Sequence, residues 1–282
     1  MLWLILRARW FWDHNPELQF GWVVLLLWAC LFWEAWGRRP PQVFHWTWRG
    51  ALLTLFGLAT LFFAQLYQAA FGLTTEGMSA LGLGALAVIA ANFDFVFGWE
   101  GLRQFAFVFA FLFLALPVPE TIYYPLVSHL QSKIAGLNVE LLNLVGIPAE
   151  RLGNAIRLPA CVVGIDEACS GIRSLQSAVM ATVFIGWYTL RRRSLRMALF
   201  GLGILLALGG NLLRSFLLSY AAHIKGPGAI ASYHDAAGWS ILAFTAAGVA
   251  GAAWALARWE KTLEDYASRA ETIGQVETTN EH

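Results

Sequence analysis

The chain has 282 residues, of which 58% are hydrophobic, 15% aromatic and 13% charged, and its formal net charge is +1. This composition is too apolar for a soluble globular domain, and the near-neutral charge gives no reason to expect a nucleic-acid partner. Several stretches of about 20 residues carry one charge or none, the length that crosses a bilayer as a helix. The composition therefore predicts an all-α, polytopic integral membrane protein.

The amino-terminal residues 1–19 mix Trp and Phe with Arg7, Arg9 and Asp13, which is typical of a segment anchored at the membrane interface. This segment could also form a short extra span, because residues 1–12 are largely apolar. Seven apolar stretches after it are predicted to span the membrane: Phe20–Trp36, Gly50–Phe71, Met78–Phe97, Leu102–Leu116, Gly171–Leu190, Met197–Ala222 and Ala236–Ala257. The expected fold is a bundle of about seven to eight transmembrane helices.

The segment at about 117–168 has a different character. Its first residues, Pro117-Val118-Pro119, stop a helix. From Glu120 to Leu144, apolar residues recur at helical spacing but polar residues interrupt them, which predicts an amphipathic helix along the membrane surface. Residues 154–163 then read as a short extended stretch.

The distribution of Lys and Arg predicts the orientation. If the loop after Trp36 is cytoplasmic, eleven of the 19 Lys and Arg residues fall inside and six outside, the bias that cytoplasmic loops show. The segment at 117–168 is then external. Residues 1–260 are expected to form one membrane domain, and residues 261–282 a charged, disordered cytoplasmic tail.

Three chemically capable residues fall on the outer side of the predicted bundle. Cys169 stands where one span begins, and His234 stands just before the last span, at its outer entrance. Arg214 lies 17 residues after Met197, roughly 26 Å along an outward-running helix, near the outer boundary of the hydrocarbon. We therefore expect the three side chains to converge on one layer.

Such a set suits peptide acyl transfer. Cysteine attacks as a thiolate, and the start of a helix lowers a thiol pKa through free N–H groups and the positive end of the macrodipole. The imidazole of His234 could take the thiol proton and later protonate the leaving amine. Since a guanidinium stays protonated, Arg214 would hold the oxyanion or the substrate carbonyl.

Each residue also has a simpler interpretation. Cys169 could form a disulfide with Cys161, eight positions away in the same external segment. Arg214 could extend its charge to lipid headgroups, and His234 could be a packing residue. The whole chain could then be a non-catalytic transporter or a scaffold for exopolysaccharide assembly and export. The Cys and His spacing fits no zinc site and no phosphate-binding loop is present, so we expect no metal and no cofactor.

The run Glu167-Ala168-Cys169-Ser170-Gly171-Ile172-Arg173-Ser174, followed by Asn211-Leu212-Leu213-Arg214 and by His234, resembles the exosortases and archaeosortases. Leu116-Pro117-Val118-Pro119, Gly146-Ile147-Pro148 and Gly153-Asn154-Ala155-Ile156 extend the resemblance upstream. It covers about residues 105–259, and the run around Cys169 is its specific part.

The resemblance implies a cysteine transpeptidase or endopeptidase of the cytoplasmic (inner) membrane with its active site on the outer face. It implies Cys169 as nucleophile, Arg214 as electrostatic partner and His234 as acid and base, with Arg173 and Asn211 near the site. The implied substrates are exported proteins with a carboxy-terminal sorting tail, namely a Pro-Glu-Pro type signature, a membrane span and a basic end. Exopolysaccharide biosynthesis proteins are implied as partners.

Overall fold

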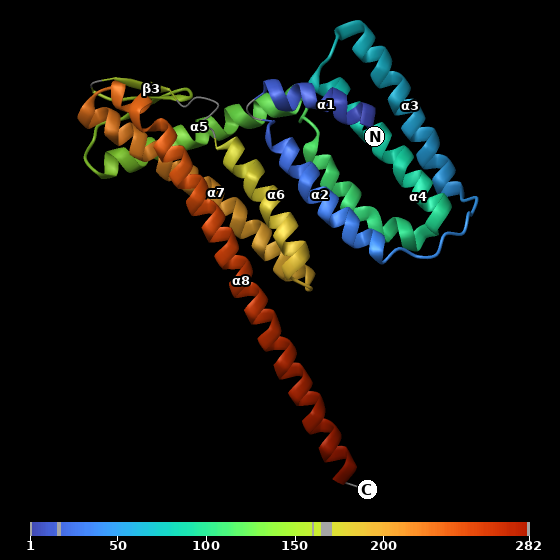
Figure 1. Ribbon diagram of the computed structural model, residues 1–282. Helices are drawn as coiled ribbons and strands as arrows, with labels where there is room; N and C mark the ends of the chain where they lie inside the picture. Colours follow the sequence, from blue (N-terminus) through green and yellow to red (C-terminus); the bar gives the residue numbers. More distant parts are fainter. Residues whose placement is uncertain (1, 16–17, 160, 165–170, 281–282) are drawn as a thin grey trace. The chain divides into compact units, whose positions relative to one another are not determined.

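The computed structural model describes residues 2–15, 18–159, 161–164 and 171–280 (Figure 1). The chain divides into two compact units, Met1–Pro125 and Leu126–His282. The boundary falls within one helix, directly after Pro125, whose ring removes a backbone donor.

The first unit consists of helices. They are α1 (Leu2–His14), α2 (Phe20–Gly37), α3 (Trp48–Phe71), α4 (Thr75–Leu112), the short 3₁₀ helix η1 (Phe113–Ala115) and the first residues of α5 (Glu120–Leu144). The first part of α4 runs beside α3 and its second part beside α2 (Figure 1). Gly57 of α3 and Gly84 of α4 let the two backbones approach closely, because a Cβ at either position would meet the opposite carbonyl oxygen at 3.0 Å or less.

A kink at Gly98 divides α4. Gly98 has φ 65° and ψ −167°, a conformation that is essentially open only to glycine. Two carbonyl oxygens just before the kink accept hydrogen bonds from the α2–α3 connection. The Phe95 oxygen accepts the His45 N–H at 2.8 Å, and the Val96 oxygen accepts the Val43 N–H at 3.1 Å. The break in the helix therefore leaves these backbone acceptors satisfied, which a span in lipid requires.

The second unit packs three helices, α6 (Ile172–Thr189), α7 (Arg193–Lys225) and α8 (Gly228–Asn280), side by side (Figure 1). Four glycines of α7 differ in how closely neighbouring helices approach them. A Cβ at Gly203 would lie 2.3 Å from Thr182 of α6, and one at Gly210 would lie 3.0 Å from Ile241 of α8. Gly201 and Gly209, by contrast, meet no neighbouring atom within 4 Å.

Most of the segment at 117–168 forms a small domain with the end of α7 and the start of α8. The predicted helix is confirmed as α5, with both bounds as predicted, and its position along the membrane surface stays a prediction. The extended stretch is part of a three-stranded antiparallel sheet of β1 (Glu150–Leu152), β2 (Ala155–Arg157) and β3 (Val162–Gly164). Its buried core joins the sheet to α5 and to the last turns of α7: Ile134, Ala135, Leu142, Ile147, Ala149, Ile156, Leu158, Val163, Leu218 and Ala222.

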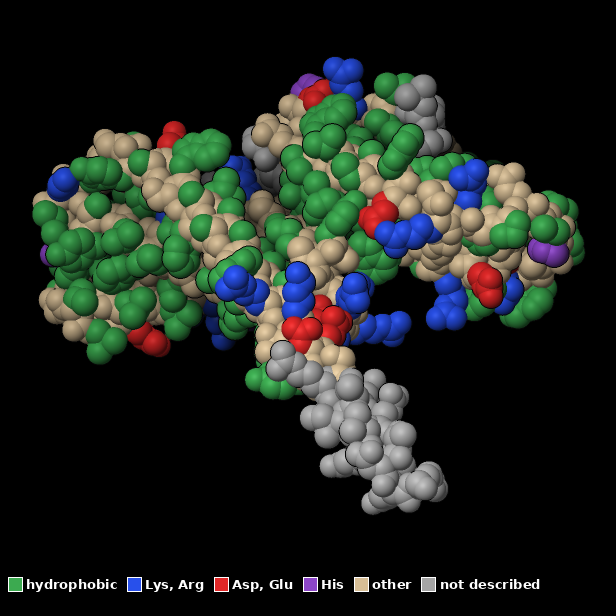
Figure 2. Space-filling view, turned by 60° about the horizontal axis from the view of Figure 1, so that its bottom comes forward, with side chains coloured by type: hydrophobic (Ala, Val, Ile, Leu, Met, Phe, Trp, Pro, Cys, Tyr) green, Lys and Arg blue, Asp and Glu red, His purple; other side chains and the backbone are tan. Residues whose placement is uncertain are grey.

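Five described helices are long and apolar enough to cross a membrane: Phe20–Gly37, Trp48–Phe71, Thr75–Ala115, Arg193–Lys225 and Gly228–Tyr266. Hydrophobic side chains cover wide areas of the face seen in Figure 2, as expected for a surface that contacts lipid. The all-α membrane fold is thus supported, and the number of seven to eight spans stays a prediction. Two predicted spans lie in the single kinked helix α4, and α6 carries Arg173, Ser174 and Gln176 in its first turns.

The last helix is longer than the sequence suggested. It begins at Gly228 instead of at about Ala236, and it continues to Asn280 past the predicted start of the tail at 261. The division into a membrane domain and a tail stays a prediction, since the helix passes through that position without a break.

Candidate active site

Arg214 of α7 and His234 of α8 are in direct contact. The Arg214 Nη2 atom lies 3.0 Å from His234 Nε2 and also donates to the His234 carbonyl oxygen at 3.3 Å. Both side chains are half-buried. Two of the three residues expected to converge therefore do so, from helices that are adjacent and antiparallel in the second unit.

His234 is on a helix, which corrects the expectation that it lies in a loop before the last span. The polar run Ser232-Tyr233-His234-Asp235 resembles a loop in sequence, but α8 has already begun at Gly228. Gly238 lies one turn after His234, on the same helix face. A Cβ at Gly238 would stand 3.3 Å from Arg214 Nη2, so the missing side chain makes room for the guanidinium.

The hydrogen bonds assign the proton on the imidazole. A guanidinium N–H can only donate, so Nε2 of His234 accepts, and the ring proton of the neutral imidazole is on Nδ1. Nδ1 lies 3.1 Å from the Asp235 carboxylate, to which it donates. The Asp235 side chain is 94% exposed, so water screens this contact.

The start of α6 packs against the turn of α7 that carries the arginine. Gly171, the residue before α6, has φ +83°, and a Cβ there would lie 2.8 Å from the Asn211 side chain. Asn211 is 1% exposed and precedes Arg214 by three residues, so the two side chains lie on neighbouring parts of α7. Arg173, the second residue of α6, is exposed. Of the two supporting residues, Asn211 is thus placed beside Arg214 by the packing.

Cys169, Glu167 and Asp166 lie outside the described residues, so the position of the expected nucleophile relative to Arg214 and His234 stays a prediction. The disulfide between Cys161 and Cys169 also stays a prediction. Within the described part of the chain, Cys30 and Cys161 are free thiols. Cys161 is half-buried against the core that joins the sheet to α5 and the last turns of α7.

A buried polar contact next to the site was not predicted. Asn138, which interrupts the apolar pattern of α5, is fully buried and donates to the Ser215 hydroxyl at 2.7 Å. Ser215 follows Arg214 directly and lies four residues after Asn211, so Asn211 and Ser215 share one face of α7. This spacing of two polar residues is the sequence signal that could have revealed the buried contact. The contact links α5 to α7 beneath the arginine.

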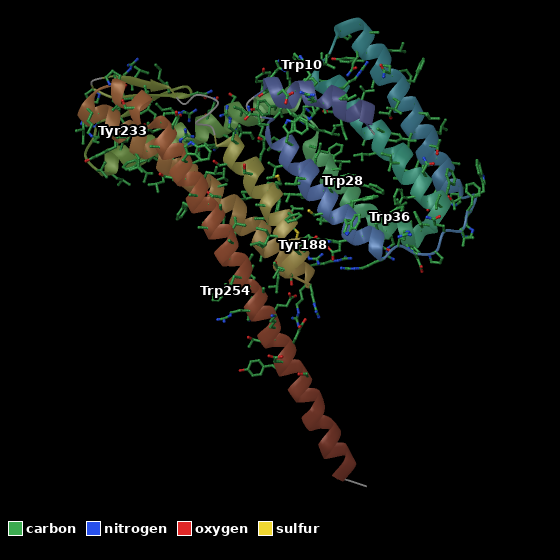
Figure 3. The ribbon with its side chains drawn as sticks, viewed as in Figure 1. Trp10, Trp28, Trp36, Tyr188, Tyr233 and Trp254 are labelled. Atoms are coloured by element: carbon green, nitrogen blue, oxygen red, sulfur yellow. The ribbon has the colours of Figure 1, made fainter. Side chains whose placement is uncertain are left out.

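A cavity of about 460 Å³ lies between the last turns of α7 and the first turns of α8, and its lining includes helix neighbours of Arg214 and His234 but neither residue itself. Leu217, Leu218 and Ala221 line it from α7, and they share the face of Arg214. Tyr233 and Ala237 line it from α8 and are the neighbours of His234 and Gly238. Figure 3 labels Tyr233 near the start of α8, beside the end of α7.

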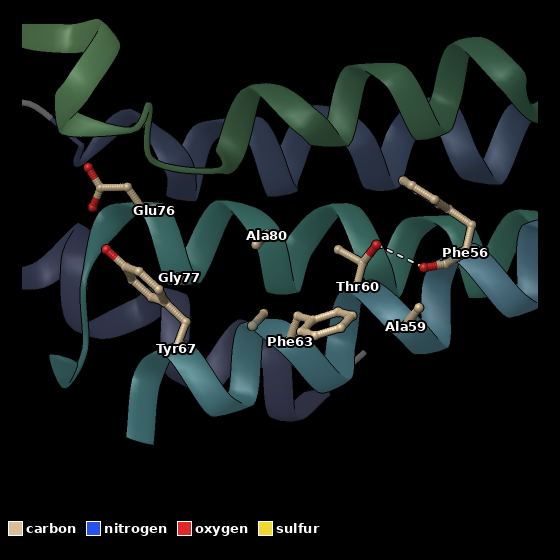
Figure 4. A pocket seen from close by; sticks show the side chains of 9 residues that line it. Phe56, Ala59, Thr60, Phe63, Tyr67, Glu76, Gly77 and Ala80 are labelled. Atoms are coloured by element: carbon tan, nitrogen blue, oxygen red, sulfur yellow. Dashed lines mark hydrogen bonds between the residues drawn. The ribbon is translucent and has the colours of Figure 1, made fainter. Parts of the chain in front are cut away.

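A second cavity, of about 560 Å³, lies between α3 and α4 in the first unit (Figure 4). Its walls are mainly apolar, and the Thr60 hydroxyl that faces it donates to the Phe56 carbonyl oxygen at 2.8 Å. Its lining contains no Cys and no His.

A family model described as transmembrane exosortase matches residues 12–251, a range that includes Cys169, Arg214 and His234. Comparison with curated proteins and with solved structures returns no match.

Proposed function

The chain belongs to the transmembrane exosortase family, and we propose that it is a membrane-embedded cysteine transpeptidase or endopeptidase. In this proposal Cys169 is the nucleophile, His234 is the acid and base, and Arg214 is the electrostatic partner. The substrates are exported proteins with a carboxy-terminal sorting tail, cut at the outer face of the cytoplasmic membrane.

One observation carries the proposal: the 3.0 Å contact between Arg214 and His234. The two residues are 20 positions apart and come from different helices, and each was selected from the sequence for a separate chemical reason. An arginine that extended its charge to lipid headgroups would not need to contact an imidazole on the neighbouring helix. Charged and ionisable groups within the spans of a membrane protein are costly and usually functional.

The start of α6 supports the role of Cys169. Two consecutive Cα–Cα steps span at most about 7.6 Å, so Gly171 is a described point close to the thiol along the chain. Gly171 packs against Asn211, on the same helix as Arg214 and one turn before it. A thiol just upstream of the α6 amino terminus would also have the helix dipole available to stabilise its thiolate.

The proposed reaction has two halves. In the first, His234 Nε2 takes the thiol proton, and the Cys169 sulfur attacks the scissile carbonyl. For this Arg214 must release Nε2, and the developing oxyanion is the stronger acceptor for its N–H groups. The carbon–nitrogen bond then breaks, His234 protonates the leaving amine, and a thioester remains on Cys169.

In the second half an amine or a water molecule attacks the thioester and restores the thiol. An amine gives a transferred protein, and water gives a cleaved one. Both outcomes share the first half and the same three residues, so the proposal covers a transpeptidase and an endopeptidase. Exopolysaccharide biosynthesis proteins are the proposed partners in the cell.

The test is processing of a co-expressed protein that carries a sorting tail. We expect Cys169→Ala and His234→Ala to leave the precursor uncut. Arg214→Ala should lose about 10²- to 10³-fold in rate, the usual cost of one oxyanion donor. His129→Ala, which removes an exposed histidine of α5, is the matched control and should process normally.

A tail-derived peptide with an electrophilic group at the scissile position should also form a covalent adduct on Cys169, detectable by mass spectrometry. Normal processing by a membrane-inserted Cys169→Ala protein would instead favour the non-catalytic alternative, a transporter or scaffold.

A further inference from the structure

The cavity between the last turns of α7 and the first turns of α8 has one charged residue among its ten lining residues. That residue is Lys225, the last residue of α7. Its Nζ donates to the Tyr233 hydroxyl at 2.7 Å and lies 4.9 Å from the centre of the Tyr233 ring. The phenol therefore holds the ammonium at the cavity, and further N–H donors of Lys225 remain available to a ligand.

The remaining lining is apolar or weakly polar: Leu217, Leu218, Tyr220, Ala221, Ile224, Tyr233, Ala236, Ala237 and Ser240. No Asp or Glu is among these residues, so the cavity presents a single positive charge within apolar walls. A complementary ligand combines an apolar body with one anionic group. The volume of about 460 Å³ is in the range of sites that bind small ligands, about 300–1,000 Å³.

The position of the cavity indicates which ligand this is. Tyr233 is next to His234 in sequence, and Leu217 and Leu218 follow Arg214 by three and four residues. A peptide bond held at Arg214 and His234 would therefore place its neighbouring side chains within reach of this cavity. An anionic lipid headgroup would also match the charge of Lys225, but its binding would not require Arg214 and His234.

We propose that this cavity is the substrate subsite next to the scissile bond, and that Lys225, positioned by Tyr233, determines specificity by binding a carboxylate of an otherwise apolar peptide segment. This inference rests on the proposed function, because it takes Arg214 and His234 as the point of reaction. It adds a binding role for two residues outside the reacting set.

The experiment measures binding separately from cleavage. The full-length Cys169→Ala protein in nanodiscs of neutral lipid is titrated with fluorescent tail peptides that carry Glu or Gln at each position flanking the scissile bond. At one position we expect the Glu peptide to bind roughly 10-fold tighter than the Gln peptide, the gain typical of a charge-assisted hydrogen bond. Lys225→Met should remove that difference and leave the binding of the Gln peptide unchanged.

Three further variants sharpen the result. Lys225→Glu should reverse the preference, so that a Lys peptide binds tighter than the Glu peptide, an exchange that a loss of folding cannot produce. Tyr233→Phe should weaken the Glu preference by a smaller factor, because it keeps the ring and removes the hydroxyl. Lys133→Met, at an exposed lysine of α5, is the matched control and should behave as the wild type.

Equal binding of Glu and Gln peptides at every position would overturn the inference, as would an equal loss for both peptides in Lys225→Met. If Lys225→Met instead changes only the dependence of binding on anionic lipid in the nanodisc, Lys225 contacts headgroups and the inference is also wrong. Failure of the proposed function gives a different pattern, since the Glu preference would be seen in binding while the wild-type enzyme cuts none of the peptides.

Discussion

At the scale of single residues, the site depends on positions where a side chain is missing. Gly238 leaves room for the Arg214 guanidinium, and Gly171 leaves room for Asn211 at the start of α6. Gly171 also has φ +83°, a conformation that costs other residues free energy. Two glycines that carry no chemistry thus make room for the Arg214–His234 contact and for the packing of α6 against α7.

Replacing Gly171 tests this dependence. Gly171→Ala places a Cβ 2.8 Å from the Asn211 side chain and forces alanine into the left-handed region, a strain of about 1–3 kcal/mol. We expect the start of α6 to shift and precursor processing to fall severalfold while the protein still inserts in the membrane. Gly209→Ala, at a position with no atom within 4 Å of the new Cβ, should process normally. Wild-type processing by Gly171→Ala would mean that this contact does not position the site.

At the scale of the elements, a side chain of one helix accepts backbone hydrogen bonds from the connection between two other helices. Glu260 of α8 is 4% exposed, and its two carboxylate oxygens accept the backbone N–H groups of Arg191 at 2.9 Å and Arg192 at 2.6 Å. Both N–H groups belong to the turn between α6 and α7, directly before α7 begins at Arg193. A residue that the sequence placed at the edge of a tail therefore joins α8 to the α6–α7 turn.

The Glu260 contact should contribute measurably to stability. Glu260→Ala leaves two donors without their carboxylate, and we expect the unfolding free energy to fall by about 1.5–3 kcal/mol. The measurement is the apparent melting temperature in detergent. Glu264→Gln is the matched control: Glu264 lies 3.9 Å from the Arg191 guanidinium and is 45% exposed, so its loss should have little effect. An equal drop in both variants would contradict this assignment.

Asp13 makes the contact between α1 and α2 sensitive to acid. Its carboxylate accepts the Arg9 Nε–H at 2.9 Å and the Trp22 Nε1–H at 3.1 Å. The hydrogen bond from Arg9, together with that from Trp22, holds the pKa of Asp13 below its ordinary value. The contact should therefore stabilise fully above about pH 4 and be lost as the pH falls through the lowered pKa.

The expected readout is the melting temperature in detergent between pH 7 and pH 3. The difference between the wild type and Asp13→Asn should be small at pH 7 and should shrink as the pH falls through the lowered pKa of Asp13. A difference that grows towards acid would have the wrong sign for a carboxyl with a lowered pKa.

At the scale of the whole molecule, the second unit has two distinct regions, the sheet with α5 and a basic turn. The sheet and α5 pack around the end of α7, while Arg191 and Arg192 lie in the turn between α6 and α7, and Arg193 begins α7. α6 connects the two, and its 18 residues are about 27 Å long, close to the thickness of the hydrocarbon core. Its polar first turns place it below the hydropathy of the five candidate spans, so whether it crosses the membrane is a direct test of the topology.

Single cysteines at exposed positions can answer this. In a protein without its native cysteines, Arg157→Cys should react with a membrane-impermeant maleimide in spheroplasts, and Arg191→Cys should react only after lysis. This result follows from the excess of Lys and Arg on the predicted cytoplasmic side. Labelling of both positions in intact spheroplasts would mean that α6 does not cross, and the opposite pattern would invert the protein.

The sequence by itself determined the class of the protein, the bounds of α5 and the identity of Arg214 and His234 as candidates. These features depend on residues that are close together in the sequence: apolar runs, prolines and charged loops. The thickness of the bilayer fixes how long an apolar run must be to span it. Only the tertiary structure decided which atoms meet. How α7 packs against α6 and α8 determines three features: the Arg214–His234 contact, the Lys225–Tyr233 cavity and the hydrogen bonds of Glu260. Small residues set this packing by letting the helices approach closely. The periodicity of a single helix does not contain this information.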